Sequence, residues 1–389
     1  MNKLAKLFLK IYASFIKKEQ TYLIFESAND FFDNAYALYQ YIKKNFPEYK
    51  LLYVVASKEQ EKSGPAHGVS KKEMIRCNKK LKLYRYSLKA KCIFFSYENY
   101  WRKLKLQPET RVVYTAHGEF PVKDCTNYYN FLFGEPQENK LDIIVRTEYA
   151  KQIIDKKYPI FTKHNEVIAG MPRSDEMFHA NLDKKYFLEK IGVKEYKNQS
   201  LIVSMTTFRH KDATGLSFFE EEFPINLNNE ELAKLNDILG KNNQILLIKL
   251  HHCQDGVIIP PNMDNIYFVT NKFMVELNIS NNILYTICDS LITDYSSAYL
   301  SFLDLDRKVG FVLIDQDKYT SSRGYTLDNV EDMMPGDKMR TKEDLNKFFD
   351  DLASKNDPYK AQRRDVKLKF TGDYKDQNCK SYTDIYLSK

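Results

Sequence analysis

Short apolar runs that end in polar clusters recur along the chain and predict buried parallel strands. In the first half these runs are Tyr22–Phe25, Lys50–Val55, Cys92–Phe95, Arg111–Thr115, Leu141–Val145 and Val167–Ala169. In the second half they are Leu201–Ser204, Ile245–Ile248, Leu291–Ile292 and Phe311–Ile314. Segments with helical spacing, such as Asn34–Lys44 and Lys342–Leu352, lie between or after them. This alternation of strand and helix is typical of doubly wound α/β domains.

The length predicts two such domains. A chain of 389 residues exceeds what one ordinary core accommodates, and 43% hydrophobic with 29% charged residues is a globular composition. The segment 182–200 is Lys-rich and weakly apolar, so we place the boundary there, with domains at 21–190 and 191–389. No GxGxxG follows the first strand and no GxxxxGK[ST] occurs, which disfavours NAD or FAD binding and a P-loop ATPase.

Residues 1–20 predict a basic amphipathic helix. Apolar side chains recur at helical spacing, with lysines between and beside them: Leu4, Leu7, Phe8, Ile11, Phe15 and Lys3, Lys6, Lys10, Lys17, Lys18. Such a helix can lie in the interface of an anionic membrane, or it can pack on the protein's own surface. We favour the membrane surface. The formal net charge of +7 suits an anionic partner such as phosphate, nucleic acid or a lipid surface without choosing among them, and no run of about 18 apolar residues could span a bilayer.

The strand ends carry the candidate chemistry. Ser296 and Ser297 follow a strand and precede helical spacing, so they can cap the helix or bind a phosphate. His117 ends another strand before Gly118, where an imidazole can act as a general base or make one structural hydrogen bond. Arg173 follows a Gly–Met–Pro turn and can bind a phosphate or pair with Asp175.

A metal site is not predicted. The second half brings Lys249, His251 and His252 to a strand end, which suggests an anion site or half of a metal site. No further His or Cys at a useful spacing offers a third ligand. The six cysteines are scattered without a CxxC pair, so neither a zinc site nor a disulfide framework is indicated, and a reducing cytosol fits.

Both halves therefore bring basic or His-bearing loops to strand ends. Two Rossmann-like domains facing each other across a cleft would direct those loops onto one ligand, which is the GT-B type of architecture. The usual donor of that architecture is a nucleotide diphosphate conjugate. Nucleic-acid binding is disfavoured, because the lysines are dispersed and no RNA- or DNA-binding module occurs.

Seven short motifs lie in one order along the chain. They are His117–Lys123 (HGEFPVK), Gly170–Asp175 (GMPRSD), Thr207–Arg209 (TFR), Lys249–His251 (KLH), Ile292–Ser297 (ITDYSS), Arg323–Asp328 (RGYTLD) and Pro335–Gly336. In order and spacing, from about Thr21 to the end, the chain resembles the CDP-glycerol:glycerophosphate glycerophosphotransferases, the teichoic acid primases and polymerases.

The resemblance implies transfer of a polyol phosphate from a CDP-polyol, glycerol first, to a lipid-linked acceptor with release of CMP, without a cofactor. The acceptor would be an undecaprenyl-linked saccharide or polyol phosphate, used at the cytoplasmic face of the membrane by a peripheral enzyme. By match to the motifs, His117 is the general base and His251 contacts the reacting phosphate or the departing CMP. The residues matched to the pyrophosphate site are Arg173, Thr207, Arg209, Ser296 and Ser297, and Gly118 would let the backbone approach the ligand.

Some positions depart from the family pattern. Glu119–Phe120 replaces Thr–Pro, Ser174 replaces Asn, and Ser301 stands where an Asp is usual. CDP-ribitol or another polyol, and a capsular or other surface glycan as acceptor, therefore stay open. The alternatives are a GT-B glycosyltransferase that uses a nucleotide sugar, and a binding or scaffold protein without activity.

Overall fold

The computed structural model of the chain describes residues 12–27, 31–134, 137–207, 229–250 and 261–388. The chain divides into two compact units. Unit 1 comprises residues 1–119, 125–176 and 374–389, and unit 2 comprises 120–124 and 177–373. The chain thus leaves unit 1 at residue 176, inside α7 (Asp175–His179), ahead of the Lys-rich segment 182–200, and its last sixteen residues return to unit 1.

Unit 1 is built on a fully parallel sheet of seven strands in the order β3-β2-β1-β4-β5-β6-β7. Its strands are β1 (Tyr22–Glu26), β2 (Lys50–Val55), β3 (Met74–Arg76), β4 (Cys92–Phe95), β5 (Arg111–Tyr114), β6 (Leu141–Val145) and β7 (Asn165–Ile168). Its helices are α2 (Asn34–Asn45), α3 (Lys58–Ser63), α4 (Lys80–Ser87), α5 (Thr126–Phe133), α6 (Glu148–Lys157) and α16 (Asn378–Tyr386), with 3₁₀ turns η1 (Gly64–His67), η2 (Lys71–Glu73), η3 (Phe161–Lys163) and η4 (Pro172–Ser174).

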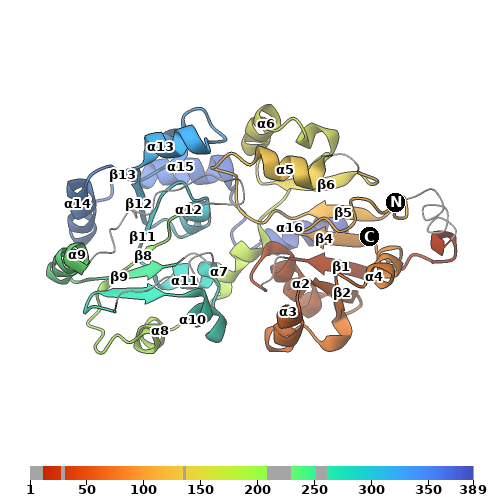
Figure 1. The fold of residues 1–389 in the computed structure, drawn as a ribbon, viewed down its shortest axis with the longest axis horizontal. Coiled ribbons are helices and arrows are strands. Elements are labelled where there is room, and N and C mark those ends of the chain that lie inside the picture. The colour runs from red at the N-terminus through yellow and green to blue at the C-terminus, as the bar shows by residue number, and fades with distance from the viewer. Residues whose placement is uncertain (1–11, 28–30, 135–136, 208–228, 251–260, 389) are drawn as a thin grey trace. The chain divides into compact units, whose positions relative to one another are not determined.

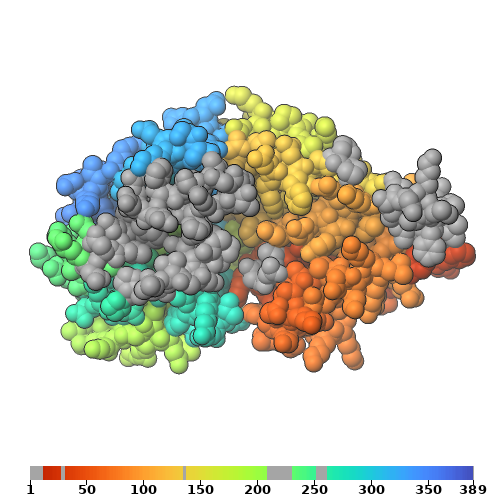
Figure 2. All heavy atoms as spheres, viewed as in Figure 1, coloured from red at the N-terminus to blue at the C-terminus, as the bar shows by residue number. Residues whose placement is uncertain are grey.

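The central strands of unit 1 are apolar on both faces. In β1, Leu23, Ile24 and Phe25 are all fully buried, as expected for a parallel strand covered by helices on each side. Leu23 and Phe25 share a cluster with Leu38 of α2 and Tyr382 of α16, so these two helices pack on the same face. Burial of each such aromatic or aliphatic side chain contributes about 1.5–3 kcal/mol to the free energy of folding. Figure 1 labels the strands and helices of this unit, and Figure 2 draws the same view with all heavy atoms, in which the described N-terminal residues run from red to orange.

Unit 2 repeats the topology with six parallel strands in the order β10-β9-β8-β11-β12-β13. Its strands are β8 (Ser200–Ser204), β9 (Gln244–Lys249), β10 (Ile266–Val269), β11 (Ser290–Thr293), β12 (Lys308–Val312) and β13 (Asp337–Met339). Its helices are α8 (Lys184–Ile191), α9 (Asn229–Lys241), α10 (Asn271–Glu276), α11 (Asn281–Ile287), α12 (Ala298–Phe302), α13 (Gln316–Ser322), α14 (Lys342–Ala353) and α15 (Lys360–Phe370), with 3₁₀ turns η6 (Leu303–Leu305) and η7 (Val330–Met333).

The core of unit 2 has the same construction. The apolar stripe of α9 (Leu232, Leu235 and Leu239) packs with Phe348 and Phe349 of α14 against β8 and β9. The short segment 120–124 belongs to this unit, where Lys123 forms an antiparallel bridge with Tyr325. The prediction of two α/β domains with parallel sheets is confirmed.

The predicted N-terminal helix lies largely outside the described residues. Residues 12–14 are helical, and Phe15 next to them is 79% exposed. The interfacial helix therefore stays a prediction. Within the described ranges, no helix has both the length and the apolar character needed to cross a bilayer.

Candidate active site

Each sheet has a point at which its strand order reverses, and ligands of open α/β sheets bind there, beyond the carboxyl ends of the strands. In unit 1 this point lies between β1 and β4, and in unit 2 it lies between β8 and β11. Asp33 begins the helix after β1, and His117 follows β5, which neighbours β4. In unit 2, Thr207 follows β8 and Ser296 follows β11. The predicted site residues that the structure describes thus lie at or beside these points of their own units.

His117 is held by a buried carboxylate. Its Nδ1 lies 2.7 Å from Oδ2 of Asp33, whose side chain is 2% exposed, whereas the side chain of His117 is 51% exposed. A carboxylate only accepts hydrogen bonds, so Nδ1 carries the proton and the acceptor lone pair of the neutral ring is on Nε2. Tyr97 packs edge-on against the ring, with centroids 5.6 Å apart. This is the geometry of an oriented general base.

Asp33 also caps helix α2, and this contact holds its carboxylate in place. Its Oδ1 accepts a hydrogen bond of 2.7 Å from the backbone N–H of Asn34 at the start of α2. A side-chain oxygen at this position satisfies one of the N–H groups that a helix start leaves without a partner. The carboxylate therefore connects the first turn of α2 to the imidazole of His117. Asp33 was not among the predicted site residues, although an Asp directly before a helical pattern is a sequence signal for a cap.

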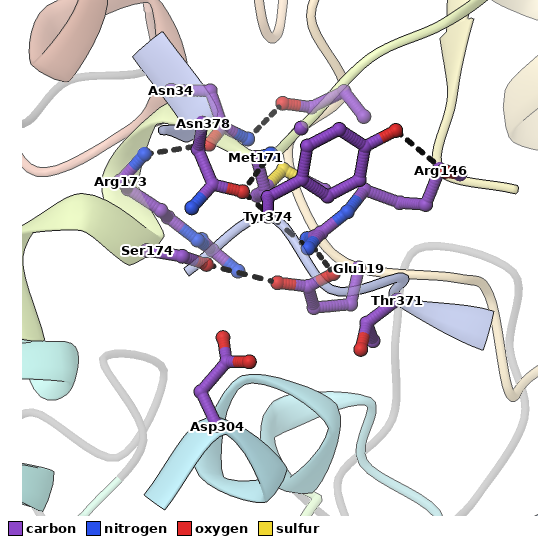
Figure 3. Close-up of polar contacts among 12 residues, drawn as sticks. Asn34, Glu119, Arg146, Met171, Arg173, Ser174, Asp304, Thr371, Tyr374 and Asn378 are labelled. Atoms are coloured by element: carbon purple, nitrogen blue, oxygen red, sulfur yellow. Dashed lines mark hydrogen bonds and ion pairs between the residues drawn. The ribbon is translucent and has the colours of Figure 1, made fainter. Parts of the chain in front are cut away.

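Asn34 and Arg173, which are hydrogen-bonded to each other in Figure 3, hold the backbone around His117. The Asn34 amide donates from Nδ2 to the carbonyl of Ala116 at 2.8 Å and accepts from the backbone N–H of Arg173 at 3.2 Å. Arg173 in turn donates from Nη1 to the carbonyl of His117 at 3.0 Å. Ala116 has a φ of 60°, a left-handed conformation that is strained for a residue with a Cβ. These hydrogen bonds stabilise the strained conformation of the turn that carries His117.

Asp175 does not pair with Arg173, which was one of the two alternatives for that residue. Its carboxylate accepts from the backbone N–H groups of Asn378 and Cys379, at 2.9 and 2.7 Å, and so caps α16. Asn378 is also bonded to the neighbouring turn, because its Oδ1 accepts from the N–H of Met171 at 2.9 Å (Figure 3). The GMPRSD motif therefore anchors the C-terminal helix to unit 1 as well as supporting the His117 turn.

A buried ion pair lies behind the same turn. Nη1 of Arg146, at the end of β6, donates to Oε2 of Glu119 at 2.7 Å, with side chains 5% and 1% exposed (Figure 3). Tyr374 donates to the carbonyl of Arg146 at 2.9 Å, and the guanidinium lies 5.3 Å from the centre of its ring. Glu119 is two residues beyond His117, so this pair fixes the far side of the turn that carries His117.

Another carboxyl group near Asp33 has little charge at neutral pH. Glu26, at the end of β1, is buried, and burial raises its pKa to about 8 despite hydrogen bonds from the N–H groups of Tyr97 and Glu98. The negative charge of Asp33 contributes to the same upward shift. At neutral pH Glu26 therefore carries less negative charge than an exposed glutamate.

In unit 2, Asp294 organises the two loops at the switch point. Its fully buried carboxylate accepts from the N–H and the hydroxyl of Thr207, each at 2.9 Å, and from the N–H of Ser296 at 3.0 Å. The Ser296 hydroxyl accepts from the N–H of Ala298 at 3.3 Å, whereas Ser297 makes no capping hydrogen bond. The helix that follows, α12, has only five residues, so the hydroxyl and N–H groups of the loops matter more here than a helix dipole.

Other predicted residues have different positions. Lys249 donates to Oδ1 of Asn271 at 2.5 Å and to the carbonyl of Leu250 at 2.7 Å, so it holds the end of β9. Arg209 and His251 lie outside the described residues, and so does His252. Among the side chains that the structure describes, no three His, Cys, Asp or Glu residues gather as metal ligands.

A family model described as CDP-glycerol:poly(glycerophosphate) glycerophosphotransferase matches residues 7–383. The chain belongs to this family. Two curated members resemble it along much of its length. The teichoic acid poly(glycerol phosphate) polymerase of Bacillus subtilis (strain 168) is 24% identical over 85% of the chain, and the teichoic acid glycerol-phosphate transferase of Staphylococcus aureus (strain NCTC 8325 / PS 47) is 26% identical over 59%. The chain spans only 44% and 59% of the lengths of these two relatives.

The fold of this glycerophosphotransferase family member is also found in a solved structure. The wall teichoic acid polymerase TagF superposes with a TM-score of 0.72 at 19% identity, covering 97% of this chain and 92% of that one. The two units with parallel sheets thus have the GT-B-like fold that was predicted.

Proposed function

We propose that the protein transfers a polyol phosphate, with glycerol phosphate as the first candidate, from a CDP-polyol to a hydroxyl of a lipid-linked acceptor. The observation that carries the proposal is the pairing of His117 with the buried Asp33 in a chain of this family. A variant of TagF has been soaked with CDPG, which supports a CDP-polyol as the donor here. The pathway would be the synthesis of teichoic acid or a related surface polymer.

The reaction is a displacement at the distal phosphorus of the pyrophosphate. The acceptor oxygen forms a bond to this phosphorus, the bond to the bridging oxygen breaks, and CMP leaves. Nε2 of His117 takes the proton of the acceptor hydroxyl, while Asp33 stabilises the imidazolium that results. The barrier that remains is one of positioning and charge, as in other phosphoryl transfers.

The donor is assigned to the loops at the switch point of unit 2. Thr207 and Ser296 are half-buried and are fixed by Asp294, so their hydroxyl groups are positioned before a ligand binds. Ser297, Arg209 and His251 are proposed to complete the set by match to the motifs. In unit 1, Arg173 would add positive charge toward the pyrophosphate, and Gly118 would let the backbone come close to the ligand.

The test is product analysis by mass spectrometry. The full chain is incubated with CDP-glycerol, CDP-ribitol or a panel of nucleotide sugars, each with a synthetic undecaprenyl-type acceptor. We expect an acceptor enlarged by polyol phosphate units together with an equal amount of CMP, and the number of units separates a primase from a polymerase. Transfer of a sugar, or no transfer from either CDP-polyol, would refute the proposal.

Replacing Asp294 with alanine should weaken donor binding. The loss of a carboxylate that accepts from Thr207 and Ser296 releases both loops, and hydrogen bonds to a charged group contribute about 1.5–3 kcal/mol each. We expect the KM for CDP-glycerol to rise about tenfold or more. Asp289→Asn is the matched control, because Asp289 lies at the opposite end of β11 and accepts from Lys184 and from the N–H of Leu201. An unchanged KM in Asp294→Ala would contradict the assignment.

Residues 1–20 are proposed to hold the protein on the cytoplasmic face of the membrane as a peripheral helix. Deleting residues 1–18 should abolish sedimentation with anionic vesicles, since the lysines and apolar side chains of this segment are removed together. Vesicles of neutral phosphatidylcholine serve as the comparison, because they lack the attraction for the lysines. If the shortened chain still sediments with anionic vesicles, the interfacial helix is not the membrane anchor.

A further inference from the structure

Unit 1 contains a pocket of ≈ 250 Å³ whose lining begins directly after Tyr97 in the sequence. It lies between the segment after β4 and the end of α5, and its lining includes Glu98, Asn99, Arg102, Lys103 and Phe131. The adjacent residue Tyr97 is the one that packs against the ring of His117. The pocket is smaller than the roughly 300–1,000 Å³ of sites that hold drug-sized ligands, so it fits a fragment of a larger substrate.

The walls of this pocket are held in place by buried anchors. Trp101 is fully buried and donates from Nε1 to the hydroxyl of Ser87 at 2.7 Å. The amide of Asn139 donates to the carbonyls of Trp101 and Leu104 at 3.3 and 2.7 Å. At the other end of the segment, Glu26 accepts from the N–H of Glu98 at 3.1 Å. A loop fixed in this way presents its side chains without first having to be ordered.

Asn99 is the most informative residue of the lining. Both polar atoms of its amide are buried, and neither has a hydrogen-bond partner within the described part of the chain. An amide in this condition costs stability unless a ligand completes its hydrogen bonds. An amide that can both donate and accept suits a ligand with oxygen atoms and hydroxyl groups.

The charges of the lining favour an anion. Arg102 lies over the ring of Phe131, 5.6 Å from its centre, and donates to the carbonyl of the same residue, which fixes the guanidinium at the wall. Lys103 is exposed at the rim, and Phe131 leaves 57% of its surface exposed. Glu98 is the acidic member of the lining. Burial raises the pKa of its carboxyl group, which reduces the electrostatic repulsion between this group and an anionic ligand.

We propose that this pocket binds a phosphate ester of the acceptor and so places the acceptor hydroxyl at His117. Arg102 and Lys103 would hold the phosphate, and Asn99 and Glu98 would bind the neighbouring hydroxyl groups. The inference rests on the proposed function, in which His117 acts on the acceptor and the loops of unit 2 hold the donor. The phosphate has two possible sources, namely a polyol phosphate already on the acceptor and the diphosphate of the lipid carrier.

The test uses Lys103→Ala and Asn99→Leu in the full chain, with Lys105→Ala as the matched control. Lys105 is an exposed lysine two residues further on that does not line the pocket. Replacing the unpartnered amide with an apolar group of similar size should not destabilise the fold, and thermal unfolding checks this. We expect the KM for the acceptor to rise about tenfold in both variants, as for a lost hydrogen bond to a charged group. The KM for CDP-glycerol and the turnover at saturating acceptor should not change.

Two acceptors identify the source of the phosphate. If the KM shift occurs only with an acceptor that ends in glycerol phosphate, the polyol phosphate is the ligand. If it also occurs with a lipid-linked saccharide that has none, the diphosphate is the ligand. An acceptor KM that stays at the wild-type value with both acceptors overturns the inference.

A binding experiment separates this inference from the proposed function. Titration of the full chain with glycerol 3-phosphate, followed by NMR or calorimetry, needs no turnover. Binding that is lost in Lys103→Ala and Asn99→Leu and kept in Lys105→Ala supports the pocket even if no CDP-polyol is consumed. Normal transfer from CDP-glycerol without such binding, and without a KM shift, would refute the pocket and leave the proposed function intact.

Discussion

Replacing His117 with alanine should lower the turnover number about 10²- to 10⁴-fold, the usual contribution of a positioned general base. The physical reason is that only Nε2 of this ring is proposed to accept the proton of the attacking hydroxyl. Binding of CDP-glycerol should persist, because the donor is assigned to loops of unit 2. The measurement is the rate of CMP release in a single turnover with saturating acceptor, together with the affinity for CDP-glycerol from calorimetry.

Two further variants show whether the effect is chemical or structural. Added imidazole should restore part of the activity of His117→Ala, because the side chain it replaces is 51% exposed and leaves an accessible space. His164→Ala is the control, since His164 lies near the carbonyl of Phe133 at 3.4 Å and has no assigned role. Normal turnover by His117→Ala would remove it from the mechanism, and a loss without rescue by imidazole would favour a purely structural role.

Asp33 should act through His117. Asn in place of Asp33 can still accept from the imidazole N–H, but it removes the negative charge that stabilises the imidazolium. We therefore expect a loss of turnover smaller than that of His117→Ala and no added loss when the two substitutions are combined, because both act on one group. Additive losses would show that Asp33 affects turnover by a route other than His117.

The sequence predicted the strands that are apolar on both faces, and the topology follows from them. The runs at Tyr22–Phe25 and Leu201–Ser204 are short and almost entirely apolar, which indicates buried strands. The helices predicted between consecutive strands are the crossover connections that parallel neighbours need. The edge strands β3, β10 and β13 were not predicted, because each has only three or four residues and one neighbour in its sheet. Such a segment is too short to leave a clear pattern.

The organisation of the units could not be predicted in the same way. The segment 120–124 belongs to unit 2, although the residues on both sides of it belong to unit 1. The segment 374–389 belongs to unit 1, although the residues before it belong to unit 2. Neither segment is long enough to carry a domain signal. Likewise, His117 was predicted as a site residue by match to the family motif, but its partner Asp33 lies 84 positions away. A single sequence contains no sign of which distant carboxylate meets which imidazole.

Replacing Arg146 with methionine should destabilise unit 1 by about 3–5 kcal/mol, the usual cost of removing one partner of a buried ion pair. Glu119 would remain buried as a charged group without the guanidinium, and its contact with the hydroxyl of Ser174, at 3.5 Å, is too long to replace that ion pair. Trp101, the single tryptophan, is buried in unit 1, so its fluorescence during urea unfolding reports on that unit alone.

The double variant Glu119→Gln with Arg146→Met separates the charge from the packing around it. Because it removes both charges, it should recover a large part of the stability that Arg146→Met loses. Lys380→Met is the control, since Lys380 pairs with Asp384 on the exposed side of α16 in the same unit, where loss of an ion pair costs little stability. If Arg146→Met unfolds at the same urea concentration as Lys380→Met, the pair contributes no more than a surface contact. The turn that carries His117 would then depend on Asn34 and Arg173 alone for its conformation.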